Sequence, residues 1–202
     1  MQDLKHNMNW NYSDFIDKHY SSLDFNSAKI IEANFQNCTF KSSSFIECRF
    51  KNCSFEQCLF INCDLSLAKF ISSVFVDVKF KSSKLIGIDW TKANIPFTLN
   101  VSFNQSNISN SIFFGLNLQN INIIHCIAKE VNFEEANLTN AKLVSTDYYK
   151  SRFQNTNLTK ADFCDAKNYA IDHKYNKLNG AVFNLPEAVS LLQGLDIVLK
   201  DN

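Results

Sequence analysis

Glycine, proline and long apolar runs are scarce in this chain. Its 202 residues include four glycines and two prolines, and so few glycines argue against a phosphate-binding loop. There is no Gly-x-Ser-x-Gly turn and no pair of histidines at metal-binding spacing. No stretch approaches the length needed to cross a membrane, and the amino terminus lacks the apolar run of a signal peptide. We expect a cytoplasmic, non-enzymatic protein that has no cofactor and no membrane contact.

An excess of charge of one sign is also lacking. Twenty acidic and twenty basic residues cancel, so no global field attracts a nucleic acid or a membrane surface. We therefore do not expect direct binding to nucleic acid.

What the sequence does contain is a strict apolar period of five. Every fifth residue is apolar from Tyr20 to Ile95, which gives 16 positions, and again from Phe103 to Phe163, which gives 13. Helices place side chains three and four residues apart on one face, and strands alternate with period two. A period of five instead predicts a chain that turns a corner at each repeat and points one large side chain inward.

A second column of small or aliphatic residues lies two positions before each large one, and together the columns can fill a narrow tube. Six of the seven cysteines fall in this column: Cys38, Cys48, Cys53, Cys58, Cys63 and Cys126. We interpret them as small buried hydrophobes. A zinc site would have to use ligands five apart instead of the usual two to four. A disulfide between Cys38 and Cys58 would need an oxidising compartment.

Residues 136–140 (Ala-Asn-Leu-Thr-Asn) and 161–163 (Ala-Asp-Phe) resemble the A-[DN]-[LF]-x-x unit of pentapeptide-repeat proteins. The resemblance spans residues 20–167. It implies an all-β fold, the right-handed quadrilateral β-helix, in which four pentapeptides make one coil. About seven coils at a strand spacing of ~4.8 Å would form a rod about 35 Å long.

Three segments are expected along the chain. Residues 1–19 would form an amino-terminal cap, residues 20–167 the β-helix, and residues 168–202 a carboxy-terminal cap with a short helix. Within the β-helix the period slips by three residues at 96–102, where Pro96 interrupts regular pairing. We expect a small bulge there, with Phe97 filling the seam instead of projecting outward.

The carboxy-terminal helix is expected to begin near Asn184, with this residue as its cap, Pro186 in the first turn and the Glu187 side chain reaching back. The segment resembles the terminal module of the quinolone-resistance (Qnr) and microcin-immunity types, which joins two subunits end to end. The resemblance implies a homodimer; a monomeric cap on the last coil is the alternative. The residues expected in the dimer contact are Leu191, Leu192, Leu195, Ile197, Val198 and Leu199.

Because large apolar side chains are expected to fill the tube, function should lie on the outer faces or the ends of the rod. Three groups of residues are candidates for a partner-binding surface. They are a basic ladder (Lys29, Arg49, Lys69), an acidic patch (Glu130, Glu134, Glu135) and three aromatic residues, of which Phe114 and Tyr149 should point outward and Phe97 lies at the period slip.

The Qnr-like resemblance implies protection of DNA gyrase or topoisomerase IV from quinolones or toxins through DNA mimicry. A full mimic of this length would carry about twenty negative charges. Residues 20–95 hold seven acidic and nine basic residues, and residues 101–163 hold five of each. Only partial mimicry fits these numbers. The alternative is a rigid scaffold for an unrelated protein partner.

Overall fold

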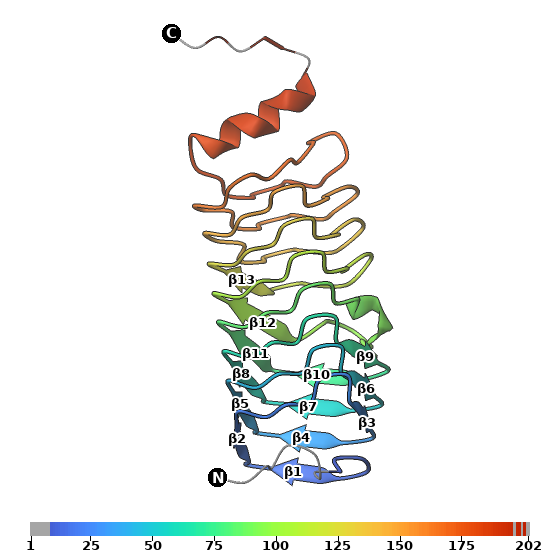
Figure 1. Cartoon of the computed structure of the whole chain (residues 1–202). Coiled ribbons are helices and arrows are strands. Elements are labelled where there is room, and N and C mark those ends of the chain that lie inside the picture. Colours follow the sequence, from blue (N-terminus) through green and yellow to red (C-terminus); the bar gives the residue numbers. More distant parts are fainter. Residues whose placement is uncertain (1–8, 196, 199, 201–202) are drawn as a thin grey trace.

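The computed structural model describes residues 9–195, 197, 198 and 200, and the chain winds as a right-handed, four-sided β-helix (Figure 1). This confirms the fold class implied by the resemblance to pentapeptide-repeat proteins. Described strands pair in parallel, and paired residues are twenty apart in most of the rod, so one coil takes four pentapeptides.

We call the sides of each coil faces 1 to 4, in the order in which the chain meets them. Face 1 holds β1 (Asp14–Ile16), β4 (Asn34–Gln36), β7 (Ser54–Glu56) and β10 (Val74–Val76). Face 2 holds β2 (His19–Ser21), β5 (Thr39–Lys41), β8 (Leu59–Ile61), β11 (Val78–Lys81), β12 (Val101–Asn104) and β13 (Asn122–Ile124). Face 3 is joined by isolated bridges such as Ser44 to Asp64. Face 4 holds β3 (Lys29–Ile31), β6 (Arg49–Lys51) and β9 (Lys69–Ile71), followed by the 3₁₀ turn η1 (Trp90–Lys92).

The large column forms ladders of stacked rings inside the tube. On face 1, the Phe35 and Phe55 ring centroids are 5.1 Å apart at an interplanar angle of 13°. On face 2, Phe40 and Phe60 are 4.6 Å apart. Trp10, which is 2% exposed, closes the amino-terminal end of this stack, with its ring centroid 4.3 Å from that of Phe25. Stacked rings therefore occupy the axis of the rod from its first described coil.

The small column also has a polar role that the sequence did not indicate. Its hydroxyl groups donate to a backbone carbonyl of the preceding coil, as Ser73 does to Phe50 over 3.3 Å and Thr156 to Phe133 over 2.9 Å. Cysteine thiols make the same contact, as Cys58 does to Phe35 over 3.3 Å. These bonds join neighbouring coils from within and satisfy side chains that would otherwise be buried without a partner.

Each corner of the coil is turned by a residue in the left-handed region. Such residues recur every five positions, and the non-glycine ones have φ between +48° and +63°. Most are Asn, Ser, Asp, Glu or Gln, among which Asn and Asp tolerate this conformation best. The corner N–H donates to the carbonyl 19 residues later, as Asp17 does to Gln36 over 3.0 Å. The corners therefore also contribute to the stacking of coils.

The expectation for Phe97 is wrong. Its side chain is 84% exposed, whereas Leu99 is 3% exposed and fills the seam instead. The Leu99 N–H donates to the Asn117 carbonyl over 3.0 Å, which returns the chain to the coil with this side chain inward. The three extra residues are taken up here, since Val78 on β11 pairs with Val101 on β12 at a separation of 23.

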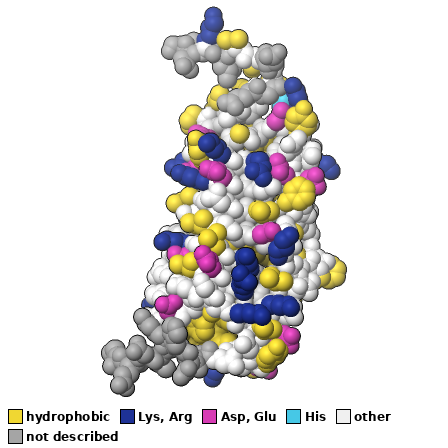
Figure 2. Space-filling view, turned by 45° about the vertical axis from the view of Figure 1, so that its right-hand side comes forward, with side chains coloured by type: hydrophobic (Ala, Val, Ile, Leu, Met, Phe, Trp, Pro, Cys, Tyr) yellow, Lys and Arg dark blue, Asp and Glu magenta, His cyan; other side chains and the backbone are white. Residues whose placement is uncertain are grey.

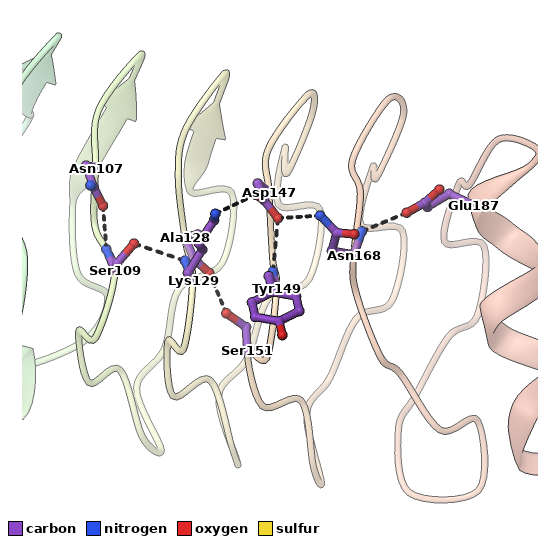
Figure 3. A network of polar contacts seen from close by, with 9 residues as sticks. All are labelled: Asn107, Ser109, Ala128, Lys129, Asp147, Tyr149, Ser151, Asn168 and Glu187. Carbon is purple, nitrogen blue, oxygen red and sulfur yellow. Dashed lines mark hydrogen bonds and ion pairs between the residues drawn. The ribbon is translucent and has the colours of Figure 1, made fainter.

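The rod ends in a second 3₁₀ element, η2 (Glu187–Leu195). Asn184 and Glu187 do not cap it as expected, because their side chains bind the coil below. Asn184 Oδ1 accepts from the Asp165 N–H over 2.9 Å. Figure 3 shows the second contact, in which Glu187 Oε1 accepts from the Asn168 N–H over 2.8 Å. Both N–H groups belong to corner residues. The two side chains thus replace the carbonyls that a further coil would have supplied 19 residues later.

None of the helical elements in the part of the chain that is described has both the length and the apolar character needed to cross a membrane.

Candidate partner-binding surfaces

The basic ladder predicted from the sequence lies on face 4 and lines a groove. Lys29, Arg49 and Lys69 are the first residues of β3, β6 and β9, and they pair in register along the rod. The groove has a volume of about 1150 Å³. Figure 1 shows η1 projecting beside β9, and Lys92 at the end of η1 also lines the groove. Figure 2 shows Lys and Arg side chains gathered over these amino-terminal coils.

The ladder cations have no acidic partner among the described residues. The ion pairs in this part of the chain include Lys92 with Asp89 at 3.7 Å, but none of them uses Lys29, Arg49 or Lys69. Asp89 also accepts a hydrogen bond from the Thr91 N–H over 3.0 Å, so its charge is engaged within η1. The positive charge of the ladder is therefore available to a ligand.

The lining of the groove includes an apolar corner residue, Leu67, that the sequence analysis did not single out. Leu67 is 49% exposed and stands at the corner between faces 3 and 4. A Cβ atom on Gly87, the corner residue one coil further, would lie 2.7 Å from Leu67 Cδ2. The absence of a side chain at Gly87 leaves this space to Leu67. A leucine at a corner position, where polar residues prevail, is the signal that could have identified it.

The acidic patch does not form as one cluster of free carboxylates. Glu134 accepts from Arg152 Nε over 3.2 Å. Glu130 and Glu135 occupy left-handed corners on opposite edges of face 4 in the same coil. Phe114 lies on the same face in the adjacent coil, where the Gly115 N–H donates to the Glu134 carbonyl over 2.9 Å.

The other two predicted aromatic residues lie elsewhere. Tyr149 is exposed on face 3, with Lys150 Nζ 5.3 Å from its ring centroid. Phe97 lies on the loop after η1, beside Val74 and Val76 of face 1. The nine predicted residues therefore do not form one surface, although face 4 carries the basic ladder, Phe114 and Glu134.

The carboxy-terminal end exposes apolar side chains. Leu191 is partly buried against the core. Leu192, Leu195 and Ile197 are exposed, and Val198 is 85% exposed. Leu199, which we also expected in a dimer contact, lies outside the described residues. The large exposed side chains at this end are Leu185, Val189, Leu192, Leu195, Ile197 and Val198.

The inner cysteines are buried free thiols. Burial raises the pKa of Cys48 and of Cys58 to about 12, and that of Cys126 to about 11. Within residues 9–195, 197, 198 and 200, no group of three or more His, Cys, Asp or Glu side chains is placed to hold a metal ion.

Two family models match the chain. One, described as a pentapeptide repeat region, matches residues 33–113, and the other, described as pentapeptide repeats (8 copies), matches residues 117–147. The chain belongs to the pentapeptide-repeat family. No curated protein matches this pentapeptide-repeat protein.

Solved structures share the fold along nearly the whole rod. One is QnrB1, a plasmid-mediated fluoroquinolone resistance protein, at 18% identity and a TM-score of 0.72, covering 96% of this chain and 94% of that one. Another is HetL from the cyanobacterium Nostoc sp. strain PCC 7120, a protein involved in heterocyst differentiation regulation. It matches at 15% identity and a TM-score of 0.65, covering 89% of this chain and 87% of that one. At these identities the likeness concerns the fold.

Proposed function

We propose that this pentapeptide-repeat protein acts without catalysis, as a rigid scaffold that binds another protein on its outer surface. The observation that carries the proposal is the division between inside and outside. The large column of apolar side chains packs along the axis. On the outside, face 4 carries cations without an acidic partner among the described residues, and exposed apolar side chains lie on face 4 and at the carboxy-terminal end. Exposed apolar patches rimmed by charge are typical of protein interfaces.

The experiment that tests the scaffold role is proximity crosslinking in the native host. A photo-crosslinking amino acid is placed at Ile71 on face 4, and a second version carries it at Ser102 on face 2. We expect one defined protein to be captured from one of these positions and to bind the purified chain reversibly. If no captured protein binds the purified chain, the scaffold proposal fails.

A second candidate is protection of DNA gyrase or topoisomerase IV by partial DNA mimicry. The similarity to QnrB1 over the length of both chains supports it. The pairing of Glu134 with Arg152 and the separation of Glu130 from Glu135 weigh against an acidic stripe like that of a duplex. A mimic would therefore have to work through a few carboxylates.

A supercoiling assay with gyrase and ciprofloxacin tests this candidate. Protection would restore supercoiling at micromolar protein, and the combined variant Glu130→Gln, Glu134→Gln and Glu135→Gln would lose it. Removing the same number of charges at Asp14, Glu56 and Asp77 is the matched control. Unchanged supercoiling with the wild-type chain removes this candidate and leaves the scaffold proposal intact.

We also propose that two copies join through their carboxy-terminal ends. Support comes from the apolar side chains exposed on and beyond η2, which exceed what the last coil covers. Truncation before Asn184 would also remove the side chains that close the last coil, so point substitutions give a cleaner test. Leu192→Glu with Leu195→Glu should yield a monomer by light scattering, and Val182→Glu should not. A wild-type chain with the mass of one subunit would refute the dimer.

A further inference from the structure

Leu67 is an unusual residue for its place in the fold. Corner positions require a left-handed backbone, which costs least for glycine and asparagine. Leu67 adopts φ +59°, and the other corners with positive φ are mostly polar or glycine. Its side chain gains no place in the core, since it is 49% exposed. A strained, exposed apolar residue points to a role outside folding.

The surroundings of Leu67 define what could bind there. Ile71 on β9 is also exposed, and both side chains line the groove on face 4. Four cations line the same groove, namely the three ladder residues and Lys92, against two carboxylates, Glu47 and Asp89. Asp89 is already paired with Lys92. The groove therefore combines exposed apolar side chains with a net positive lining.

We propose that this groove binds an acidic segment of a partner protein, with an apolar side chain of that segment seated on Leu67 and Ile71. The carboxylates of the segment would meet Lys29, Arg49 and Lys69, which follow one another at the strand spacing of ~4.8 Å. This inference rests on the proposed scaffold function and assigns it a surface and a partner chemistry.

The apolar side chains in the groove favour a protein segment over a nucleic acid. A phosphate backbone offers regular charge but no aliphatic side chain to cover Leu67 and Ile71. An acidic peptide offers both, and burial of an apolar anchor beside complementary charges is a common source of binding energy at protein interfaces.

The test is a selection of random peptides displayed on phage against the immobilised full chain. We expect the enriched peptides to be rich in Asp and Glu and to carry a leucine or an aromatic residue. The enriched peptide should bind the combined variant Lys29→Gln, Arg49→Gln and Lys69→Gln about tenfold more weakly or worse, because glutamine keeps much of the stem and removes the charge. The matched control removes three charges from face 2 through Lys41→Gln, Lys81→Gln and Lys142→Gln, and should bind as the wild type does.

Leu67→Asn separates binding from folding. Asparagine suits the left-handed corner, so the variant should be at least as stable as the wild type in urea, while its affinity for the enriched peptide falls about tenfold. Enrichment of sequences without acidic residues, or equal binding to the face 4 variant, overturns the inference. The inference is also overturned if the wild type binds oligothymidylate and only the face 4 variant loses this binding. If only the face 2 control lost binding, the assignment of the partner to face 4 would be wrong, and the proposed scaffold function would stand.

Discussion

At the scale of single residues, the inner cysteine thiols should be unreactive toward thiol reagents in the folded protein. The thiolate is the reactive form of cysteine, and burial raises the pKa of Cys48 and Cys58 to about 12. Cys164 is the partly exposed cysteine. We predict that the native chain shows one accessible thiol with Ellman's reagent at mildly alkaline pH, and seven after denaturation. Cys164→Ser should remove the native signal, and prompt reaction of more than one thiol would contradict the buried column.

A second prediction at this scale concerns Asp147 on face 3. Burial alone would raise the pKa of its carboxyl. Hydrogen bonds from Asn168 Nδ2 at 2.7 Å and the Tyr149 N–H at 3.2 Å, with Lys129 Nζ at 3.4 Å, outweigh burial and lower the pKa below the usual 3.8 (Figure 3). A carboxyl with a lowered folded pKa stabilises the fold above its unfolded pKa and loses that contribution as pH falls through the folded value.

We therefore expect the wild type to lose more stability than Asp147→Asn between pH 5 and pH 2, measured by urea unfolding at each pH. At neutral pH the wild type should be the more stable of the two. Asp24→Asn, on the same face and without a described ion pair, serves as the control. Parallel pH profiles for the wild type and Asp147→Asn would contradict the assignment.

At the scale of elements, the carboxy-terminal segment completes the last coil through two side chains. The N–H groups of Asp165 and Asn168 donate hydrogen bonds to Asn184 Oδ1 and Glu187 Oε1. Removing either acceptor by substitution with alanine should cost about 1 kcal/mol locally. We expect the matching amide to exchange its hydrogen about fivefold faster, as read by NMR. Gln154→Ala, at an exposed position of the coil, should leave both amides unchanged.

The same segment indicates what could be predicted from the sequence. The inward columns were predictable because each buried position demands an apolar or small residue, and the demand repeats every five residues. The roles of Asn184 and Glu187 were not, since the same residue types at this spacing are also typical of a local helix cap. Nor was the choice between Phe97 and Leu99 at the seam, because both are apolar and the period is interrupted there. The left-handed corner conformation leaves only a weak signal in the sequence, because several types of polar residue can adopt it.

For the candidate site, the period of twenty correctly placed Lys29, Arg49 and Lys69 in one ladder. The groove itself was not predictable. It depends on the protruding η1 turn and on the space that Gly87 leaves beside Leu67, and neither follows from periodicity.

At the scale of the whole molecule, the rod is a one-dimensional stack in which each coil contacts its neighbours. In such a stack a defect should weaken the coils around it and spare distant ones. Trp10 tests this property, because it is 2% exposed and closes the amino-terminal end against rings such as Phe25 and Phe35.

We predict that Trp10→Ala lowers the local free energy of opening by about 3–5 kcal/mol, the usual cost of emptying a buried tryptophan site. Amide hydrogen exchange should accelerate across residues 14–41 and stay unchanged across residues 122–163. Tyr12→Asn, which alters a neighbouring exposed ring at a corner, should leave both regions as they are. Equal acceleration in both regions would mean that the rod opens as a single cooperative unit, and the nearest-neighbour description would then be wrong.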